Sequence, residues 1–113
     1  MRITLPLQAV VGALLQQPDE EKFGLEIAED SGLEPAVIYG VLQRLRTAGW
    51  VEDRWEDAEI AHREGRPPRR YYRLSPEGRA RGIHALQKGR DRSRIGRLLT
   101  PPAIVPTSER GPT

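Results

Sequence analysis

The sequence of 113 residues contains no cysteine, only one phenylalanine and one methionine, and no long apolar run. Without cysteine there is neither a disulfide framework nor thiolate chemistry, as expected of a protein from a reducing compartment. No apolar stretch approaches the roughly 20 residues that a helix needs to span a bilayer. A signal peptide is not expected either, because Pro6 comes early and no small-residue cleavage site precedes the acidic residues 19–21. We therefore expect a cytoplasmic domain.

The residue types that carry catalysis or bind metals are sparse and scattered. His62 and His84 are the two histidines, and they lie in unrelated sequence settings. The sequence has no glycine-rich phosphate loop of the P-loop or dinucleotide type, and no His/Cys cluster with metal-ligand spacing. We therefore expect no catalytic residue, no metal ion, no cofactor and no enzymatic activity.

Positive charge is concentrated in the second half of the chain, although the net charge is only +2. Residues 1–34 carry 2 basic and 7 acidic side chains, whereas residues 62–99 carry 12 basic and 3 acidic ones. Such an asymmetry favours a surface that faces a polyanion such as nucleic acid. The alternative is an ordinary solvated, arginine-rich surface.

Apolar residues at helical spacing predict three helices in the first half of the chain, over residues 5–17, 22–31 and 35–48. Gly32 is the expected left-handed stop of the second helix, and Pro35 begins the third. Two short helices around such a tight connection are typical of a helix-turn-helix. The inner face of the third helix is expected to consist of Ile38, Val41, Leu42 and Leu45.

Two strands are predicted in the second half. Alternation over residues 50–57 and the aromatic run over residues 70–74 indicate β structure, with Tyr72 and Leu74 facing the core. The polar, turn-rich residues 58–69 between them are expected to form the loop of a two-stranded β-hairpin wing. Three helices followed by such a hairpin are the element order of an α+β winged helix-turn-helix fold.

A last helix is predicted to start at Ser75-Pro76, with serine as its cap and proline in its first turn. We place the winged helix domain, with the start of this helix, at residues 1–88. Glycines weaken the helix further on, so residues 89–99 are expected to continue it only where they pack against a partner. The proline-rich residues 100–113 are expected to form a disordered tail.

The outer face of the third helix has the side chains of a DNA-reading surface. Gln43 can pair with adenine, and small neighbours permit a close approach to the major groove. Tyr39 can reach a phosphate or a thymine methyl; the alternative is a half-buried core aromatic. The expected DNA contacts from this helix are Ala36, Tyr39, Gly40, Gln43, Arg44, Arg46 and Thr47.

Five arginines cluster in and beside the predicted wing loop. The Pro67-Pro68 pair is expected to stiffen its tip and to lower the entropy lost on docking. Such a loop can lay arginines along the DNA backbone or into a minor groove. The alternative is an unstructured, solubilising loop. The arginines expected to contact DNA are Arg63, Arg66, Arg69, Arg70 and Arg73.

Two segments resemble the PadR family of bacterial winged helix transcriptional regulators: FGLEIAEDSGLEPAVIYGVLQRLRTAGWVEDRWE and EGRPPRRYYRLSPEGRA. The resemblance covers roughly residues 5–88. It implies a homodimeric repressor of transcription whose first helix and C-terminal dimerisation helix form the dimer interface, bound to a pseudo-palindromic operator in double-stranded DNA. The dimer contacts expected on this basis are Leu7, Val11, Leu14, Ile83 and Leu86.

The resemblance also raises ligand sensing, since some members of the family release DNA when a small aromatic compound binds. Trp50 and Trp55 can line such a site; the alternative is that they pack the wing against the core. Family members often have Ser or Thr where this chain has Glu34 and Val37, so no DNA contact is inferred at these positions. A second function also stays open, in which the winged helix binds an acidic protein partner instead of an operator.

Overall fold

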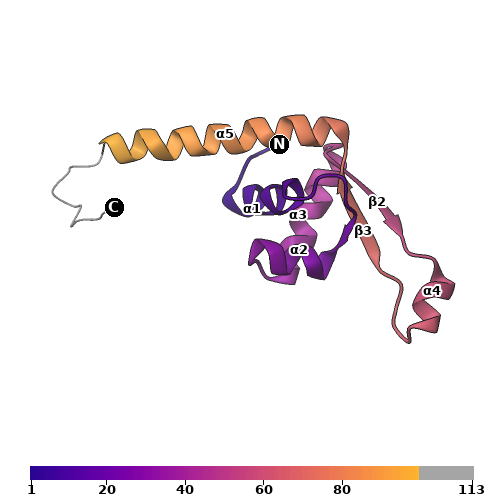
Figure 1. Cartoon of the computed structure of the whole chain (residues 1–113). Coiled ribbons are helices and arrows are strands. Elements are labelled where there is room, and N and C mark those ends of the chain that lie inside the picture. Colours follow the sequence, from indigo (N-terminus) through magenta and orange to yellow (C-terminus); the bar gives the residue numbers. More distant parts are fainter. Residues whose placement is uncertain (100–113) are drawn as a thin grey trace.

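The computed structural model describes the backbone of residues 1–99 and the side chains of residues 1–89. The predicted tail, residues 100–113, lies outside the described residues. Helices α1, α2 and α3 form a bundle, a long helix α5 lies across it, and the strands β2 and β3 project to one side (Figure 1). This arrangement is the predicted α+β winged helix-turn-helix fold.

The three predicted helices of the first half are present as α1 (Leu5–Leu15), α2 (Gly24–Ser31) and α3 (Pro35–Thr47). Local chemistry sets their ends. The Thr4 hydroxyl accepts a hydrogen bond from the Leu7 amide at 3.3 Å and thereby caps α1. Gly32 ends α2 in the left-handed region, at φ 75°, where a side chain would be strained.

The sheet has three antiparallel strands in the order β1-β3-β2, where two were predicted. The predicted strands are β2 (Val51–Trp55) and β3 (Arg70–Leu74), and Tyr72 and Leu74 face the core as expected. The additional strand β1 (Lys22–Phe23) pairs with the far edge of β3. The prediction that the second helix starts at residue 22 was therefore wrong by two residues, because a two-residue strand is too short to show alternation.

The prediction of a loop over residues 58–69 was wrong in part, because its first half is a helix, α4 (Ala58–Arg63). Asp57 caps this helix, its carboxylate accepting a hydrogen bond from the Glu59 amide at 2.8 Å. Ala61 is its one buried residue. We call β2, α4, β3 and their connections, residues 51–74, the wing.

Helix α5 (Pro76–Leu99) begins where predicted and includes residues 89–99. At its start, the Ser75 hydroxyl donates to the Gly49 carbonyl at 2.6 Å and accepts from the Gly78 amide at 3.0 Å. Its glycines permit close packing: a Cβ at Gly82 would lie 2.7 Å from Val11 of α1. Within residues 1–99, no helix is both long and apolar enough to cross a membrane.

The hydrophobic core lies among α1, α2, α3, the sheet and the first half of α5. Three residues expected at a dimer interface belong to this core: Leu7, Val11 and Leu14 are at most 2% exposed within a single chain. Because the first helix is apolar enough to be enclosed by its own chain, these side chains are not available to a second subunit. Ile83, by contrast, is 44% exposed, and Leu86 is partly buried against the core.

Candidate nucleic-acid interface

The outer face of α3 is open to solvent. The helix buries Ile38, Val41, Leu42 and Leu45, the four residues predicted to face inward. The exposed residues include all those expected from this helix to contact DNA, namely Ala36, Tyr39, Gly40, Gln43, Arg44, Arg46 and Thr47. The structure thus brings them together on one helical surface. Glu34 precedes them and is also exposed, and its carboxylate does not cap the helix.

Tyr39 lies over the start of α2 and not in the core. Its side chain is 49% exposed. A Cβ at Gly24 would lie 2.7 Å from the Tyr39 hydroxyl oxygen and from a ring carbon, so only glycine leaves room for the ring there. Gly24 is a functional candidate that the sequence reasoning did not assign, because the contact joins two different helices.

At the wing tip, Arg66 is held by acidic residues. Its guanidinium donates to both carboxylate oxygens of Glu56, at 2.6 and 2.8 Å, and to Glu64 at 2.9 Å. The Glu56 side chain is only 7% exposed and also accepts the Arg69 amide at 3.2 Å. This bidentate pair joins a residue before α4 to a residue after it, and it leaves Arg66 little freedom to contact a phosphate.

The pKa of the Glu56 carboxyl reflects this arrangement. Hydrogen bonding by Arg66 stabilises the ionised form and lowers the pKa to about 2, and the Arg69 amide acts in the same direction. Glu56 is therefore ionised throughout the physiological range and neutralises Arg66. The sequence reasoning counted the wing arginines but not the carboxylates opposite them.

Asp53 joins the wing to α3. Its carboxylate accepts from the Arg70 guanidinium at 2.6 Å and lies 3.2 Å from Arg46 of α3. Two of the arginines expected to contact DNA therefore share one acidic partner. The arrangement fixes the wing relative to α3, and Asp53 is a residue that the sequence reasoning missed.

Two further arginines of the wing have carboxylate partners that the register of the sheet places beside them. Glu52 lies opposite Arg73 on the neighbouring strand, with the charged groups 3.6 Å apart. Arg54 lies opposite Tyr71 and pairs with Glu21, donating to its two carboxylate oxygens at 2.7 and 2.8 Å. This hydrogen bonding lowers the pKa of the Glu21 carboxyl. Acidic residues on β2 and beside β1 thus offset much of the positive charge of the strands.

Four arginines among residues 1–89 have no carboxylate within ion-pair distance among the described side chains: Arg2, Arg44, Arg63 and Arg69. Arg69 instead lies 4.0 Å above the ring of Phe23, a cation–π contact. Arg63 is exposed in the last turn of α4. Arg44 is on the open face of α3, and Arg2 lies in the segment before α1.

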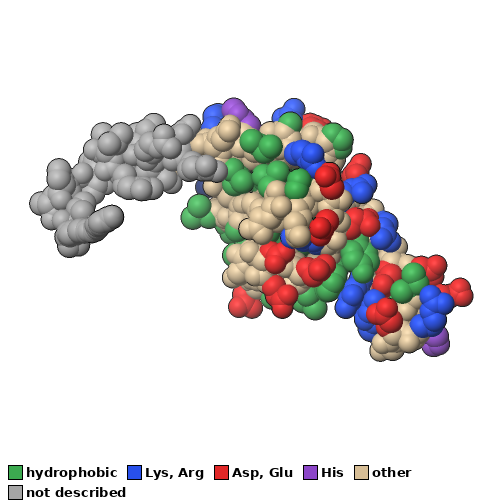
Figure 2. All heavy atoms as spheres, viewed as in Figure 1, with side chains coloured by type: hydrophobic (Ala, Val, Ile, Leu, Met, Phe, Trp, Pro, Cys, Tyr) green, Lys and Arg blue, Asp and Glu red, His purple; other side chains and the backbone are tan. Residues whose placement is uncertain are grey.

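The surface of the wing tip carries both signs of charge. Figure 2 shows acidic and basic side chains interspersed over the projecting end that contains α4. Residues 56–69 include 4 acidic and 3 basic side chains. The wing tip is therefore not the uniformly basic surface that a view of its arginines alone suggested.

One groove borders α3 on the side of the wing, and another borders it on the side of the segment before α1. The first, which we call the wing groove, has a volume of about 620 Å³ and lies between the wing and the starts of α2 and α3. Trp55, which is 62% exposed, lines it, whereas Trp50 is buried in the core. Its other lining residues are Phe23, Gly24, Leu25, Tyr39, Arg66, Pro67, Pro68, Arg69, Arg70 and Tyr72.

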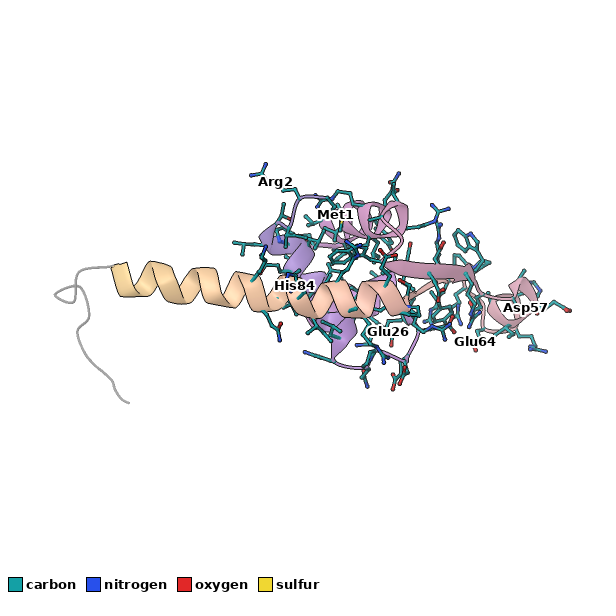
Figure 3. The ribbon with its side chains drawn as sticks, turned by 90° about the horizontal axis from the view of Figure 1, so that it is seen from above. Met1, Arg2, Glu26, Asp57, Glu64 and His84 are labelled. Atoms are coloured by element: carbon teal, nitrogen blue, oxygen red, sulfur yellow. The ribbon has the colours of Figure 1, made fainter. Side chains whose placement is uncertain are left out.

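The second groove, which we call the arm groove, has a volume of about 560 Å³ and lies between α3 and the segment before α1. Figure 3 shows Arg2 at the edge of the protein, away from Asp57 and Glu64 at the wing tip. The arm groove is lined by Met1, Arg2, Gly40, Gln43, Arg44, Thr47 and Ala48.

The helix-turn-helix formed by α2 and α3, with the outer face of α3 exposed and a wing after it, defines a winged helix protein. Solved structures share this fold. A PadR family transcription regulator from hypervirulent Clostridium difficile has a TM-score of 0.67 at 18% identity, over 86% of this chain and 100% of that one. Bordetella bronchiseptica BpsR, whose DNA binding is regulated by 6-hydroxynicotinic acid, has a TM-score of 0.67 at 18% identity, over 89% of this chain and 70% of that one.

The sequence identifies the family. Residues 13–82, more than half of the chain, match the transcriptional regulator PadR-like family. No curated protein matches the chain. The chain belongs to the PadR-like family: it is a DNA-binding transcriptional regulator and not an enzyme.

Proposed function

We propose that this chain is a homodimeric, sequence-specific repressor that places α3 of each subunit in the major groove of a pseudo-palindromic operator. The observation that carries this proposal is the open outer face of α3, where Gly40, Gln43 and Thr47 are all exposed. No other element within residues 1–99 covers that face, so base edges can approach it. In a symmetric dimer the two helices would contact half-sites about 34–36 Å apart.

The dimer interface proposed here is on α5. Ile83 is 44% exposed, and the three leucine and valine positions of α1 are enclosed by the chain itself. A dimer that used α5 would bury the exposed Ile83 side chain and leave the outer face of α3 free. The partly buried Leu86 lies at the edge of the same surface.

For the wing we propose a smaller part in DNA binding than its arginine content suggests. Arg63 and Arg69 are the two that have no carboxylate partner among the described side chains and so remain suited to phosphates. Arg66, Arg70 and Arg73 would act mainly by holding the wing in place.

A selection of bound sequences from a random DNA pool tests the operator proposal. We expect an enriched motif with two-fold symmetry, a dimer in sedimentation equilibrium, and binding that weakens steeply with salt. Loss of transcription from a reporter that carries the selected motif would support repression. Failure to enrich any motif, with unselected DNA bound equally well, would contradict sequence-specific binding.

A protein-binding function is the second candidate, and the mixed charge of the wing tip favours it. The exposed Glu34 at the start of α3 also disfavours close contact with phosphates. Gln43→Ala distinguishes the two functions, because it should alter the preferred DNA sequence only when α3 reads bases. Unchanged DNA binding in Gln43→Ala and Arg44→Ala would favour the protein partner.

We further propose that the wing groove binds a small aromatic effector and that this binding regulates the affinity of the protein for its operator. The protein would carry out this sensing in the cytoplasm. Aromatic side chains line it, and its volume of about 620 Å³ is in the range of small-molecule sites. Titration with 6-hydroxynicotinic acid, the compound that regulates BpsR, should quench the exposed Trp55 and weaken operator binding. A Trp55→Phe variant identifies the responding tryptophan, and a flat response across a set of aromatic acids would exclude the effector.

A further inference from the structure

The segment before α1 lies beside the open face of α3. It forms one side of the arm groove, and Gly40, Gln43, Arg44, Thr47 and Ala48 of α3 and its end form the other. Two arginines and no carboxylate line this groove. Its charge is therefore complementary to an anion, whereas four of the six wing arginines, Arg54, Arg66, Arg70 and Arg73, face acidic residues of the same chain.

The position of Arg2 is fixed by its neighbours. Thr4 caps α1, and Ile3 is partly buried against the core, so Arg2 directly precedes an anchored stretch of backbone. Its side chain is exposed and has no carboxylate within ion-pair distance among the described residues, and the same holds for Arg44. Among the side chains of residues 1–89, neither guanidinium is held in an ion pair that it must leave to meet a ligand.

The floor of the arm groove allows close approach. A Cβ placed at Gly40 would meet no atom within 4 Å, so the space above this residue is open. Gln43 and Thr47 flank it and supply an amide and a hydroxyl as hydrogen-bond donors. Two guanidiniums, an amide and a hydroxyl around an open space suit the oxygens of phosphodiesters, which take hydrogen bonds from such groups.

We propose that residues 1–3 are a second DNA-contacting element and that Arg2 and Arg44 hold the same stretch of phosphodiester backbone at the edge of the major groove. This inference rests on the proposed function, in which α3 enters that groove. Arg2 then contributes affinity without sequence information, while Gln43 reads a base. The positive charge that meets DNA comes in part from the start of the chain and not only from the wing.

The test compares Arg2→Gln and Arg44→Gln with a matched control, Arg81→Gln. Arg81 is exposed on α5 and pairs with Glu77 at 2.8 Å, and it does not line the arm groove, so its substitution removes the same charge without changing the proposed contact. Any affinity tag is placed at the C-terminus, so that Arg2 keeps its surroundings. Operator affinity is measured by fluorescence anisotropy over a series of salt concentrations.

Each of the two substitutions should weaken binding roughly fivefold to tenfold in 0.1 M salt and reduce the slope of log K against log salt by about 1. The preferred sequence should stay the same, and Arg81→Gln should leave both quantities unchanged. Ethylation of backbone phosphates should interfere with wild-type binding at positions where it no longer affects Arg2→Gln.

One result overturns the inference and leaves the proposed function intact: Gln43→Ala shifts the sequence preference while Arg2→Gln binds with wild-type affinity and slope. If the wild-type protein enriches no DNA motif, the proposed function fails by itself, before Arg2 is tested. If Arg2→Gln abolishes binding of an acidic protein but not of DNA, the arm groove binds a protein partner, which also overturns the inference.

Discussion

Helix α3 and the wing both carry arginines, but the two regions differ in what surrounds those arginines. In the wing, Arg66 donates two hydrogen bonds to the Glu56 carboxylate, and Arg70 shares the Asp53 carboxylate with Arg46 of α3. On the open face of α3, Arg44 has no carboxylate within ion-pair distance among the described side chains. Arginine content therefore does not locate a DNA contact by itself, because a guanidinium that is held by a carboxylate is less available to phosphate than an unpaired one.

Of all substitutions in α3 and the wing, the one that removes a base contact of α3 should have the largest effect on operator recognition. Gln43→Ala should cost about 1–3 kcal/mol of discrimination at one operator base pair, since the side chain can pair with adenine through two hydrogen bonds. Selection of bound sequences should give a motif in which that one position has become degenerate.

Arg73→Ala is the matched control for that experiment, because Arg73 is exposed on the wing and faces Glu52. It should change affinity little and uniformly across sequences. A motif that is altered by Arg73→Ala and not by Gln43→Ala would reverse the roles assigned to the two regions.

A smaller effect, of opposite sign, is expected when a wing arginine is released. Glu56→Gln keeps the shape of the side chain but removes the charge that neutralises Arg66. Binding to unrelated DNA should become tighter, roughly fivefold in 0.1 M salt, and its salt slope steeper by about 1. Glu64→Gln is the control, because Glu64 is exposed and is the weaker of the two partners. If Glu56→Gln leaves non-specific binding unchanged, the pairing does not limit the wing.

A finer comparison concerns the position of Tyr39 on α3. Gly24→Ala places a Cβ within 2.7 Å of the Tyr39 side chain, so the ring must move from its place over α2. We expect operator affinity to fall by about threefold, which corresponds to the free energy of one weak polar contact. In a double-mutant cycle the cost should vanish on a Tyr39→Ala background. A cost that persists without Tyr39 would show that Gly24 acts through α2 alone.

The smallest effect is a pH dependence of the wing tip. Hydrogen bonding by Arg66 lowers the folded-state pKa of Glu56 to about 2 from an ordinary value of 4.5. Because the folded pKa is the lower one, the pair contributes stability that is fully present above about pH 4.5 and is lost as the pH falls toward 2. The carboxyl carbon shift of Glu56 in NMR should titrate with a midpoint near 2. A midpoint near 4.5 would mean that the pair with Arg66 is not formed in solution.

Much of the fold could be predicted because it depends on local patterns. The helical spacing of Ile38, Leu42 and Leu45 fixed which face of α3 is inward, and the alternation around Tyr72 fixed the orientation of β3. The predictions that failed lacked such a pattern. Strand β1 is two residues long, and α4 lies in a polar stretch where an Asp cap is the main helical signal.

The candidate site was predicted less completely than the fold. The exposure of the α3 residues was predicted correctly, because exposure follows from helical periodicity. The roles of Arg66 and Arg70 were not, because Glu56 and Asp53 reach them only through the pairing of β2 with β3. In the same way, Gly24 acquires a role only when α2 packs beside α3, and Arg2 only when α1 carries it to the edge of that helix.

By itself, the sequence determined the order of the main elements, the family and the open face of α3, because each depends on spacing within a short segment. The tertiary structure decided which arginines remain unpaired, which leucines of α1 are enclosed, and that the segment around Arg2 borders α3. These properties depend on contacts between residues far apart in the chain, and the electrostatic state of a guanidinium is set by the nearest carboxylate in space.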